Sequence, residues 1–323
     1  GPAASGNSGA PAPSSDGASA SGASASGEAW PSGNLTLTVP WKAGGGADTA
    51  ARLVAKFWEQ ELGTKIVIEN RDGADCLVGT EYYYGLKQDC NNLIFMAQPF
   101  YANSIIASGA TYTMDDISVI NAIEMDPSCL AVMPDSNYKT LEDLDAAIKA
   151  NPGQIKFGVN GGSPHLILAN LLIEHYGWDV KLVYYGGAAE SRAALLGGHV
   201  DVIATTLTGC VDEVPIVIGS YDRNPSIPDV PTFKEIVGDE NAPLFATSRF
   251  LGVSTEAKEA YPERYQILVD SLQRTFESDD FQAALKDAGR DAISQWYGPE
   301  ESDEMSRALF DFTETYQDIL SGQ

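Results

Sequence analysis

Cysteine, histidine and basic residues are scarce in this sequence, and each scarcity excludes a class of protein. The 323 residues include four cysteines and three histidines, with no C-x-x-C pair and no zinc-type histidine spacing. Lys and Arg together number 20, against 45 Asp and Glu, so the net charge is -25. So acidic a chain repels phosphate backbones and anionic lipid surfaces. We therefore expect no metal site and no nucleic-acid partner.

Long apolar runs are also missing. No stretch of about 18 apolar residues is present, which predicts no membrane-spanning helix, and no signal-peptide pattern is found. Residues 1–33 are instead almost wholly Gly, Ala, Ser and Pro, without an aromatic side chain before Trp30. This composition predicts a flexible linker. We favour a tether of the kind that follows a lipid-anchored cysteine, over a tail without a role.

Short apolar strands alternate with helical patterns from Leu35 onward, which predicts parallel β-α-β units and an α/β fold. The length suggests two domains of roughly 150 residues each. The section from about Pro231 onward is mostly helical, and we expect it to complete the first domain. The main predicted strands are 35–39, 65–70, 92–98, 129–134, 155–159, 181–185, 200–206 and 214–220, and the main predicted helices are 48–62, 77–86, 166–177, 192–198, 260–289 and 300–320.

Glycine or small polar residues stand at four joints where a strand leads into a helix. These joints are 41–48, 71–78, 159–165 and 185–191. At such joints the free N–H groups and the positive end of the helix dipole favour an anion. Glycine also lets a ligand approach the backbone closely. The joints therefore predict a site for something small and anionic.

Enzyme motifs at these joints are incomplete. Gly44 and Gly46 fit the first two positions of a dinucleotide-binding G-x-G-x-x-G, and Glu69 has the expected distance, but Thr49 replaces the third glycine. No G-K-[ST] follows the glycines, and "GGSPH" is not a nucleophile elbow. A nucleotide-dependent oxidoreductase stays a remote alternative. We expect no catalytic residues and no cofactor.

Four segments together resemble one family, the extracytoplasmic solute-binding proteins of tripartite tricarboxylate transporters (TctC or Bug). They are "VPWKAGGGADTAARLVAKFWEQELGTKIVIENRDGADCLVG", "NPGQIKFGVNGGSPHLILANLLIEHYG", "VYYGGAAESRAALLGGHVDV" and "IPDVPTFKEIVG". The resemblance covers Leu35 to nearly the C-terminus. It implies a two-lobed clamshell of the type II periplasmic-binding kind, each lobe a mostly parallel sheet flanked by helices. We expect lobe 1 to comprise 34–126 and 231–323, lobe 2 to comprise 127–230, and crossings near 124–130 and 221–231.

The resemblance also implies a function without catalysis. Such a protein captures a small carboxylate between its lobes, outside the cytoplasm at the cell surface or in the periplasm. It acts as a monomer and delivers the ligand to the membrane permease subunits. A sensing surface receptor with the same ligand is the alternative. The implied ligand-binding residues are Lys42, Ala43, Gly44, Gly45, Asp48, Gly73, Ala74, Asp75, Asn160, Gly161, Gly162, Ser163, His165, Tyr185 and Gly186.

The second loop departs from the family pattern. Asp75 and Cys76 stand where the family usually has glycines, and an extra carboxylate there would repel a second acid group. A ligand with one carboxylate and a neutral or amine-bearing other end is therefore our hypothesis, with a plain dicarboxylate as the rival. The segment after Thr206 is also shorter than in the family, so one wall of the cleft is expected to differ.

Several of these residues have a structural interpretation as well. Asp48 and Ser163 stand where a helix N-cap is expected, although a cap can still border a ligand. His165 and Lys42 are each open between a ligand contact and local packing or solvation. The tyrosines at 82–84 are expected in packing or at the surface.

The cysteines divide into two pairs with different expectations. A helix between Cys76 and Cys90 would hold them roughly 20 Å apart, too far for a disulfide. Cys129 and Cys210 could meet near a lobe crossing if their strands are antiparallel neighbours, which an exported protein permits.

Overall fold

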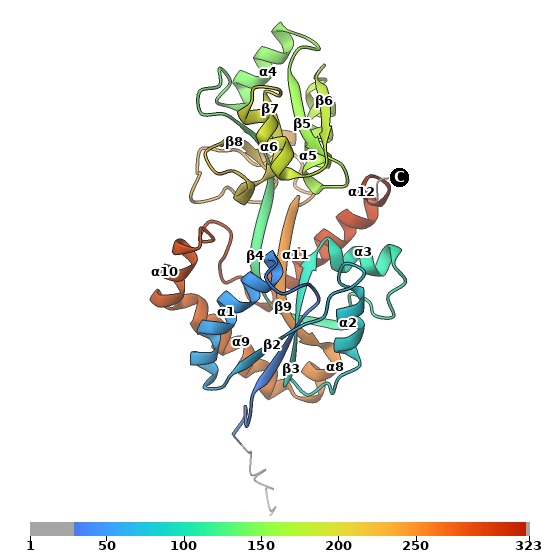
Figure 1. Cartoon of the computed structure of the whole chain (residues 1–323), viewed down its shortest axis with the longest axis vertical. Helices are drawn as coiled ribbons and strands as arrows, with labels where there is room; N and C mark the ends of the chain where they lie inside the picture. The colour runs from blue at the N-terminus through green and yellow to red at the C-terminus, as the bar shows by residue number, and fades with distance from the viewer. Residues whose placement is uncertain (1–28, 321–323) are drawn as a thin grey trace, which may run out of the picture.

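The computed structural model describes residues 29–320, which form two lobes stacked along the long axis of the molecule (Figure 1). Most of the predicted linker, residues 1–28, lies outside the described residues. Trp30, at the end of that segment, packs against lobe 1, where its indole Nε1 donates to Asn91 Oδ1 at 2.9 Å. The first lobe therefore begins a few residues earlier than the predicted boundary at residue 34.

Lobe 1 is built on a mixed sheet in the strand order β2-β1-β3-β9-β4. The first three strands of the chain run parallel to one another, and β9 and β4 join them in antiparallel pairs. The elements of the first part are β1 Leu35–Val39, α1 Gly46–Leu62, β2 Ile66–Asn70, α2 Leu77–Tyr84, β3 Asn92–Gln98, α3 Phe100–Ala107 and β4 Ile117–Val132.

Lobe 2 repeats the arrangement on a second part of the same sheet. Strands β7, β5 and β6 run parallel, and β4 pairs antiparallel with β7 and β8. Its elements are α4 Leu141–Ala150, β5 Lys156–Asn160, α5 Pro164–Tyr176, β6 Lys181–Tyr185, α6 Ala188–Leu196, β7 Val202–Thr206, a 3₁₀ turn at Leu207–Gly209, β8 Val214–Ile218 and α7 Phe233–Val237.

The C-terminal section returns to lobe 1 through β9. It contains β9 Ala246–Ser254, α8 Thr255–Ala260, α9 Pro262–Glu277, α10 Asp279–Asp287, α11 Pro299–Thr315 and α12 Gln317–Leu320. The single helix predicted over 260–289 is in fact broken at Ser278, whose hydroxyl caps α10 by accepting from the Phe281 N–H. Helix α9 packs on α1, where the Trp58 indole donates to the Ser271 hydroxyl at 2.8 Å. This buried pair fixes the section onto the lobe 1 core.

One strand, β4, belongs to both lobes. Residues 117–127 pair with β9 in lobe 1, and residues 128–132 pair with β7 and β8 in lobe 2. The sequence predicted only the apolar end of this strand, from residue 129. The earlier part carries polar side chains that are nevertheless buried, since Asn121 is 0 % and Glu124 is 4 % exposed. Partners distant in the sequence satisfy them, and periodicity does not reveal such partners.

The second crossing differs from the prediction. Phe233, Ala242 and Phe245 lie in the core of lobe 2, together with residues of β5 and β8. The chain leaves that lobe only where β9 begins, at Ala246. The boundary predicted at residue 231 is therefore corrected to 245, because an apolar cluster holds the intervening segment in lobe 2. Beyond that clustered segment, β4 and β9 run side by side between the lobes (Figure 1).

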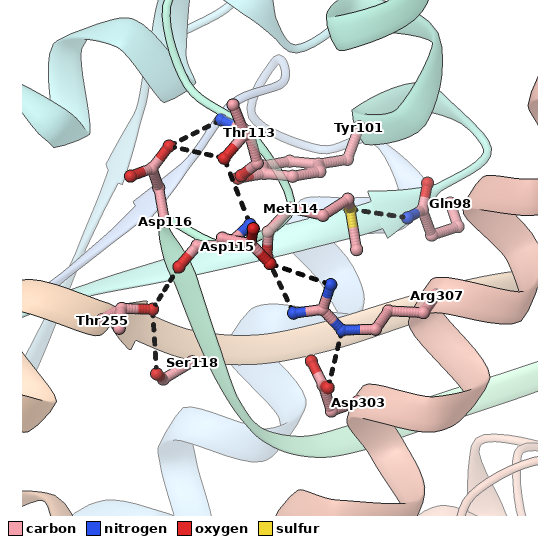
Figure 2. Close-up of polar contacts among 10 residues, drawn as sticks. All are labelled: Gln98, Tyr101, Thr113, Met114, Asp115, Asp116, Ser118, Thr255, Asp303 and Arg307. Carbon is pink, nitrogen blue, oxygen red and sulfur yellow. Dashed lines mark hydrogen bonds and ion pairs between the residues drawn. The ribbon is translucent and has the colours of Figure 1, made fainter.

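Helix α11 is bonded to the β3–β4 connection of lobe 1, as Figure 2 shows. The Arg307 guanidinium donates to Asp115 Oδ1 at 3.0 Å and to Asp303 Oδ2 at 2.9 Å. Buried Gln98 donates to the Ser306 carbonyl at 3.4 Å. These contacts attach α11 to lobe 1. The far end of α11 reaches lobe 2, where Phe312 joins the core. Of the helices within 29–320, none has both the length and the apolar character needed to cross a bilayer.

Candidate functional site

The loops predicted to bind a ligand lie at the carboxyl ends of parallel strands. In lobe 1, β1, β2 and β3 each end in a short loop that leads into α1, α2 or α3. In lobe 2, β5 and β6 lead in the same way into α5 and α6. The carboxyl edge of such a sheet exposes helix N-termini and backbone N–H groups.

Asp48 organises the first glycine loop. It occupies the third position of α1, while Gly45 is the N-cap, so the expectation that Asp48 is the cap is wrong by three residues. Its carboxylate accepts from the Gly44 N–H at 2.8 Å, Arg52 Nε at 2.9 Å and Asn70 Nδ2 at 3.0 Å. Burial alone raises the pKa of Asp48, but these donors together hold it below its usual value. The side chain is 4 % exposed and clamps the loop.

The clamped loop presents N–H groups at the start of α1. The first helical hydrogen bond runs from the Thr49 N–H to the Gly45 carbonyl at 2.9 Å. The N–H groups of Gly46, Ala47 and Asp48 precede that bond and so lack an intrahelical acceptor. Gly44 has a φ of 83°, which turns the chain sharply into this arrangement. An anion placed here meets three N–H groups and the positive end of a 17-residue helix.

The second loop adopts left-handed backbone conformations. Gly73, Ala74 and Asp75 have φ values of 145°, 45° and 58°. Asp75 is exposed. Aspartate tolerates this region better than most residues, and glycine better still, which fits the glycines that the family usually has here. The role of this loop at the predicted site is therefore mainly to set the backbone conformation.

Lys42 is solvated. Its side chain is 83 % exposed, and its Nζ lies 3.7 Å from Asp72 Oδ2 on the neighbouring loop. An ion pair this exposed contributes little energy. Lys42 nevertheless lines a cavity at this edge of lobe 1, together with Asp72. The tyrosines at 82–84 take the packing or surface positions expected from the sequence, and Tyr83 is fully buried.

In lobe 2, Ser163 begins α5 as predicted. Its hydroxyl accepts from the Leu166 N–H at 3.3 Å and donates to the Asn160 carbonyl at 2.8 Å. Asn160 itself is 6 % exposed, and its Nδ2 has no hydrogen-bond partner within the described part of the chain. Such an orphaned donor at a helix N-terminus is suited to a ligand or a water molecule. Gly161 adjoins it and is exposed.

The C-terminal helix α12 approaches this loop closely. A Cβ added to Gly162, which has a φ of 70°, would lie 2.9 Å from the Leu320 carbonyl oxygen. The segment that begins in lobe 1 as α11 therefore reaches the ligand edge of lobe 2 at Leu320. Glycine at this position permits both the backbone conformation and the approach.

His165 stands in the first turn of α5. Its Nδ1 is buried and without a partner in the region the structure describes. Burial lowers the pKa of His165 to about 4. The imidazole is therefore neutral near pH 7, and it offers a ligand a hydrogen bond without charge.

Tyr185 and Gly186, the last two predicted ligand residues, lie in different surroundings. Tyr185 packs on the apolar cluster between β7 and α6, with its ring against Gly158. The Gly186 N–H donates to Glu190 Oε2 at 3.0 Å. Glu190 thus repeats at α6 what Asp48 does at α1, since each is the third helical residue and bonds back to a glycine before the cap.

The structure adds three residues that the predicted ligand-binding set did not contain, although Trp41 lies in the first predicted joint. Trp41, Phe100 and Arg249 line a cavity of about 350 Å³ at the carboxyl edge of β1 and β3. Phe100 was overlooked because it follows a strand that lacks a glycine joint. Arg249 lies some 200 positions from the first loop, and the only signal was a charge inside an apolar strand, "ATSRFLGVS".

Solved structures with the same architecture include a solute-binding protein and two proteins with bound carboxylates. A TctC solute-binding protein from Polaromonas, without ligand, is 23 % identical with a TM-score of 0.72, over 91 % of this chain and 100 % of that one. An R. palustris protein solved with adipate has a TM-score of 0.62 and 21 % identity, over 91 % and 99 %. MatC from Rhodopseudomonas palustris, with bound malate, has a TM-score of 0.57 and 21 % identity, over 90 % and 100 %. The two lobes therefore have the clamshell fold of periplasmic binding proteins.

Sequence relatives give the same result. A UPF0065 protein of Pseudomonas sp. strain P51 is 26 % identical over 65 % of each chain, and one of Agrobacterium vitis is 28 % identical over 64 % of this chain and 62 % of its own. The chain thus spans just under two thirds of these relatives. The sequence model of the family described as tripartite tricarboxylate transporter family receptor (TctC) matches residues 50–304. Members are solute-binding receptors and not enzymes, which excludes the oxidoreductase alternative. The chain belongs to this family of receptors.

Proposed function

We propose that this protein captures a small carboxylate between its lobes, outside the cytoplasm, and delivers it to the permease subunits of a tripartite transporter. The observation that carries the proposal is the meeting of the open N–H groups of α1 with the Arg249 guanidinium at one cavity. Both features attract a carboxylate, and backbone donors hold it without a large change of shape.

Local charge supports an anionic ligand despite the acidic chain. Arg249 and Lys42 both line the cavity, and Asp72 is the acidic side chain that lines it with them. Two cations against one exposed carboxylate leave this edge positive, and the wall of low dielectric strengthens the effect. The malate and adipate in the solved relatives are carboxylates, which agrees with this chemistry.

An amine-bearing carboxylate is the alternative ligand, and a variant of Asp75 distinguishes the two ligand classes. Its exposed side chain is free to turn toward or away from a ligand. We compare Asp75→Gly with the parent protein by calorimetric titration of succinate and of aspartate. If Asp75 contacts an amine, only aspartate binding weakens. Unchanged affinities for both ligands place Asp75 outside the site.

The main test is a thermal-shift screen followed by calorimetry. The panel contains mono-, di- and tricarboxylates, amino acids and aromatic acids. A ligand at 100 times its Kd stabilises the folded protein by about 2.7 kcal/mol, which is readily measured. Binding of at least one carboxylate, and of none of the corresponding amides, supports the proposal. A complete absence of carboxylate binding overturns it.

Transport is tested separately from binding. Membrane vesicles that contain the permease subunits should take up the bound carboxylate only when the receptor is added. A protein that binds the carboxylate but gives no uptake is a sensing receptor instead. We expect the receptor to act as a monomer, with its N-terminal segment as the tether.

A further inference from the structure

The cavity at the edge of lobe 1 combines one fixed cation with apolar walls. It is about 350 Å³ in volume, which is near the lower end for a small-molecule site. Trp41, Phe100 and Arg249 are among the residues that line it. Such a composition selects a ligand with one charged end and one apolar body.

The Arg249 guanidinium is held in place by a buried acid. Its Nη1 donates to Glu124, whose side chain is 5 % exposed, while Arg249 is 23 % exposed. Arg290 Nη1 also lies 3.2 Å from Glu124 Oε1. Two guanidinium groups thus share one carboxylate, and one positive charge is left over in a half-buried site. Partial burial strengthens the attraction of that charge for a ligand anion.

The second amino group of Arg249 faces the start of α1. A Cβ built on Gly46 would lie 2.8 Å from Arg249 Nη2, so the guanidinium adjoins the first helical residue. A carboxylate at this point accepts from Nη2 and from the N–H groups of α1 together. Guanidinium geometry favours two parallel bonds to one carboxylate. Glycine at position 46 leaves the room that this approach requires.

The aromatic pair supplies a surface for the rest of the ligand. Trp41 packs edge-on against Phe95 at 6.1 Å and against Phe100 at 6.0 Å between ring centroids. Phe100 lines the cavity and is 39 % exposed, so part of its ring is open to a ligand. Flat apolar side chains of this kind bind rings and branched alkyl groups.

Among the described residues that line the cavity, a second carboxylate on the ligand meets no second cation held in place by a buried acid. Lys42, at the rim, is solvated and lies beside Asp72. We propose that the cavity selects a monocarboxylate with a ring or branched apolar body, held by Arg249 and stacked on Trp41 and Phe100. This inference rests on the proposed function and narrows its ligand class.

Calorimetry with four probes tests the ligand class. The probes are benzoate, its neutral analogue benzamide, adipate and citrate. We expect benzoate to bind at least tenfold more tightly than adipate or citrate, and benzamide not to bind. If adipate or citrate binds and benzoate does not, the ligand class is wrong while carboxylate capture stands. If no carboxylate in the wider panel binds, carboxylate capture fails as well.

Variants assign the contacts. Arg249→Gln should weaken benzoate binding by about 30-fold or more, because a charged partner is lost. The matched control is Arg274→Gln, which removes an arginine at a distant, half-exposed ion pair with Glu61 and should leave affinity unchanged. Phe100→Ala should weaken benzoate by roughly tenfold but leave any adipate binding within twofold.

Phe100→Ala keeps the proposal testable if Arg249→Gln does not fold. Arg249→Gln leaves Glu124 with Arg290 alone, and its fold must be checked by circular dichroism. If that variant is unfolded, Phe100→Ala decides, because the ring is 39 % exposed and its removal leaves the buried ion pairs of Glu124 intact. Equal loss of benzoate and adipate binding in Phe100→Ala, or no loss of either, overturns the assignment.

Discussion

The sulfur atoms of Cys129 and Cys210 lie 3.7 Å apart without a bond between them. Cys129 belongs to β4, just beyond the crossing between the lobes, and its antiparallel neighbour β7 leads to Cys210. The meeting of these thiols, left open by the sequence, is therefore confirmed, and the cross-link itself is not formed. Cys76 and Cys90 are also free.

Mild oxidation should join this pair. Cys210 is partly exposed and Cys129 is fully buried, so a small-molecule disulfide should first form a mixed disulfide at Cys210. The Cys129 sulfur then attacks the Cys210 sulfur, and the second small-molecule thiol is released. The closed loop spans 81 positions, and such cross-links stabilise proteins by roughly 2–4 kcal/mol. Non-reducing peptide mapping and thermal unfolding measure the outcome. Cys210→Ser serves as the control, and a failure to cross-link after prolonged oxidation would contradict the prediction.

Replacement of Asp48 by asparagine should loosen the first ligand loop. Asp48→Asn keeps the shape but loses the charge that Arg52 and two further donors meet. We expect a loss of roughly 1–3 kcal/mol in unfolding free energy at pH 7. The pKa of Asp48 is lowered in the folded protein, so the parent loses this contribution only as the pH falls through that lowered value.

Urea unfolding at pH 7 and near pH 3 measures both effects. The gap between the parent and Asp48→Asn should narrow at the lower pH. Asp72→Asn is the matched control, because its ion pair with Lys42 is exposed and contributes little. A gap that is unchanged between the two pH values would show that the charge of Asp48 does not stabilise the loop.

His165 should make the stability of lobe 2 depend on pH. Burial lowers its pKa to about 4 in the folded protein, so between pH 6.5 and 4 the unfolded chain binds a proton that the folded chain does not. Stability is therefore complete above pH 6.5 and falls by up to about 3 kcal/mol as the pH approaches 4. His165→Gln should flatten this slope in chemical unfolding, and His175→Gln, at an exposed position of the same helix, is the control. An unchanged slope in His165→Gln argues against the buried imidazole as its source.

Ala74→Gly should stabilise the protein. Ala74 has a φ of 45°, where a Cβ is strained by about 1–2 kcal/mol. The greater freedom of glycine in the unfolded chain offsets part of that gain, which leaves roughly 0.5–1 kcal/mol. Ala51→Gly, in the middle of α1, should instead lose about 1 kcal/mol. If both variants lose stability equally, the strain at Ala74 is absent.

Ligand binding should reduce the radius of gyration. The lobes are joined by β4 and β9, and a carboxylate held by Arg249 on one side gains further contacts at Asn160 only when the lobes approach. Small-angle scattering with and without saturating ligand is the measurement. Identical radii would contradict closure, unless the free protein already has the smaller value.

The sequence predicted what depends on neighbouring residues. The glycine loop before α1 and the cap at Ser163 were predicted from local chemistry, because their partners lie within a few positions. The polar half of β4 was missed, since Glu124 is buried by arginines more than 100 positions away. Arg249 was missed for the same reason. Long-range ion pairs leave no periodic pattern in a single sequence.

The paired passage of β4 and β9 between the lobes restricts how the molecule can deform. Asp126 pairs with Thr247 and Pro127 with Ala246 at the crossing itself, so the connection is a two-stranded ribbon and not a pair of loose loops. A ribbon of this kind resists stretching and sliding, because either motion breaks its hydrogen bonds, but it can bend and twist with those bonds intact. The lobes therefore close by bending or twisting of the ribbon and not by sliding past one another. Because the register of β4 and β9 is kept throughout, each closure brings the same ligand edges of the two lobes to face each other.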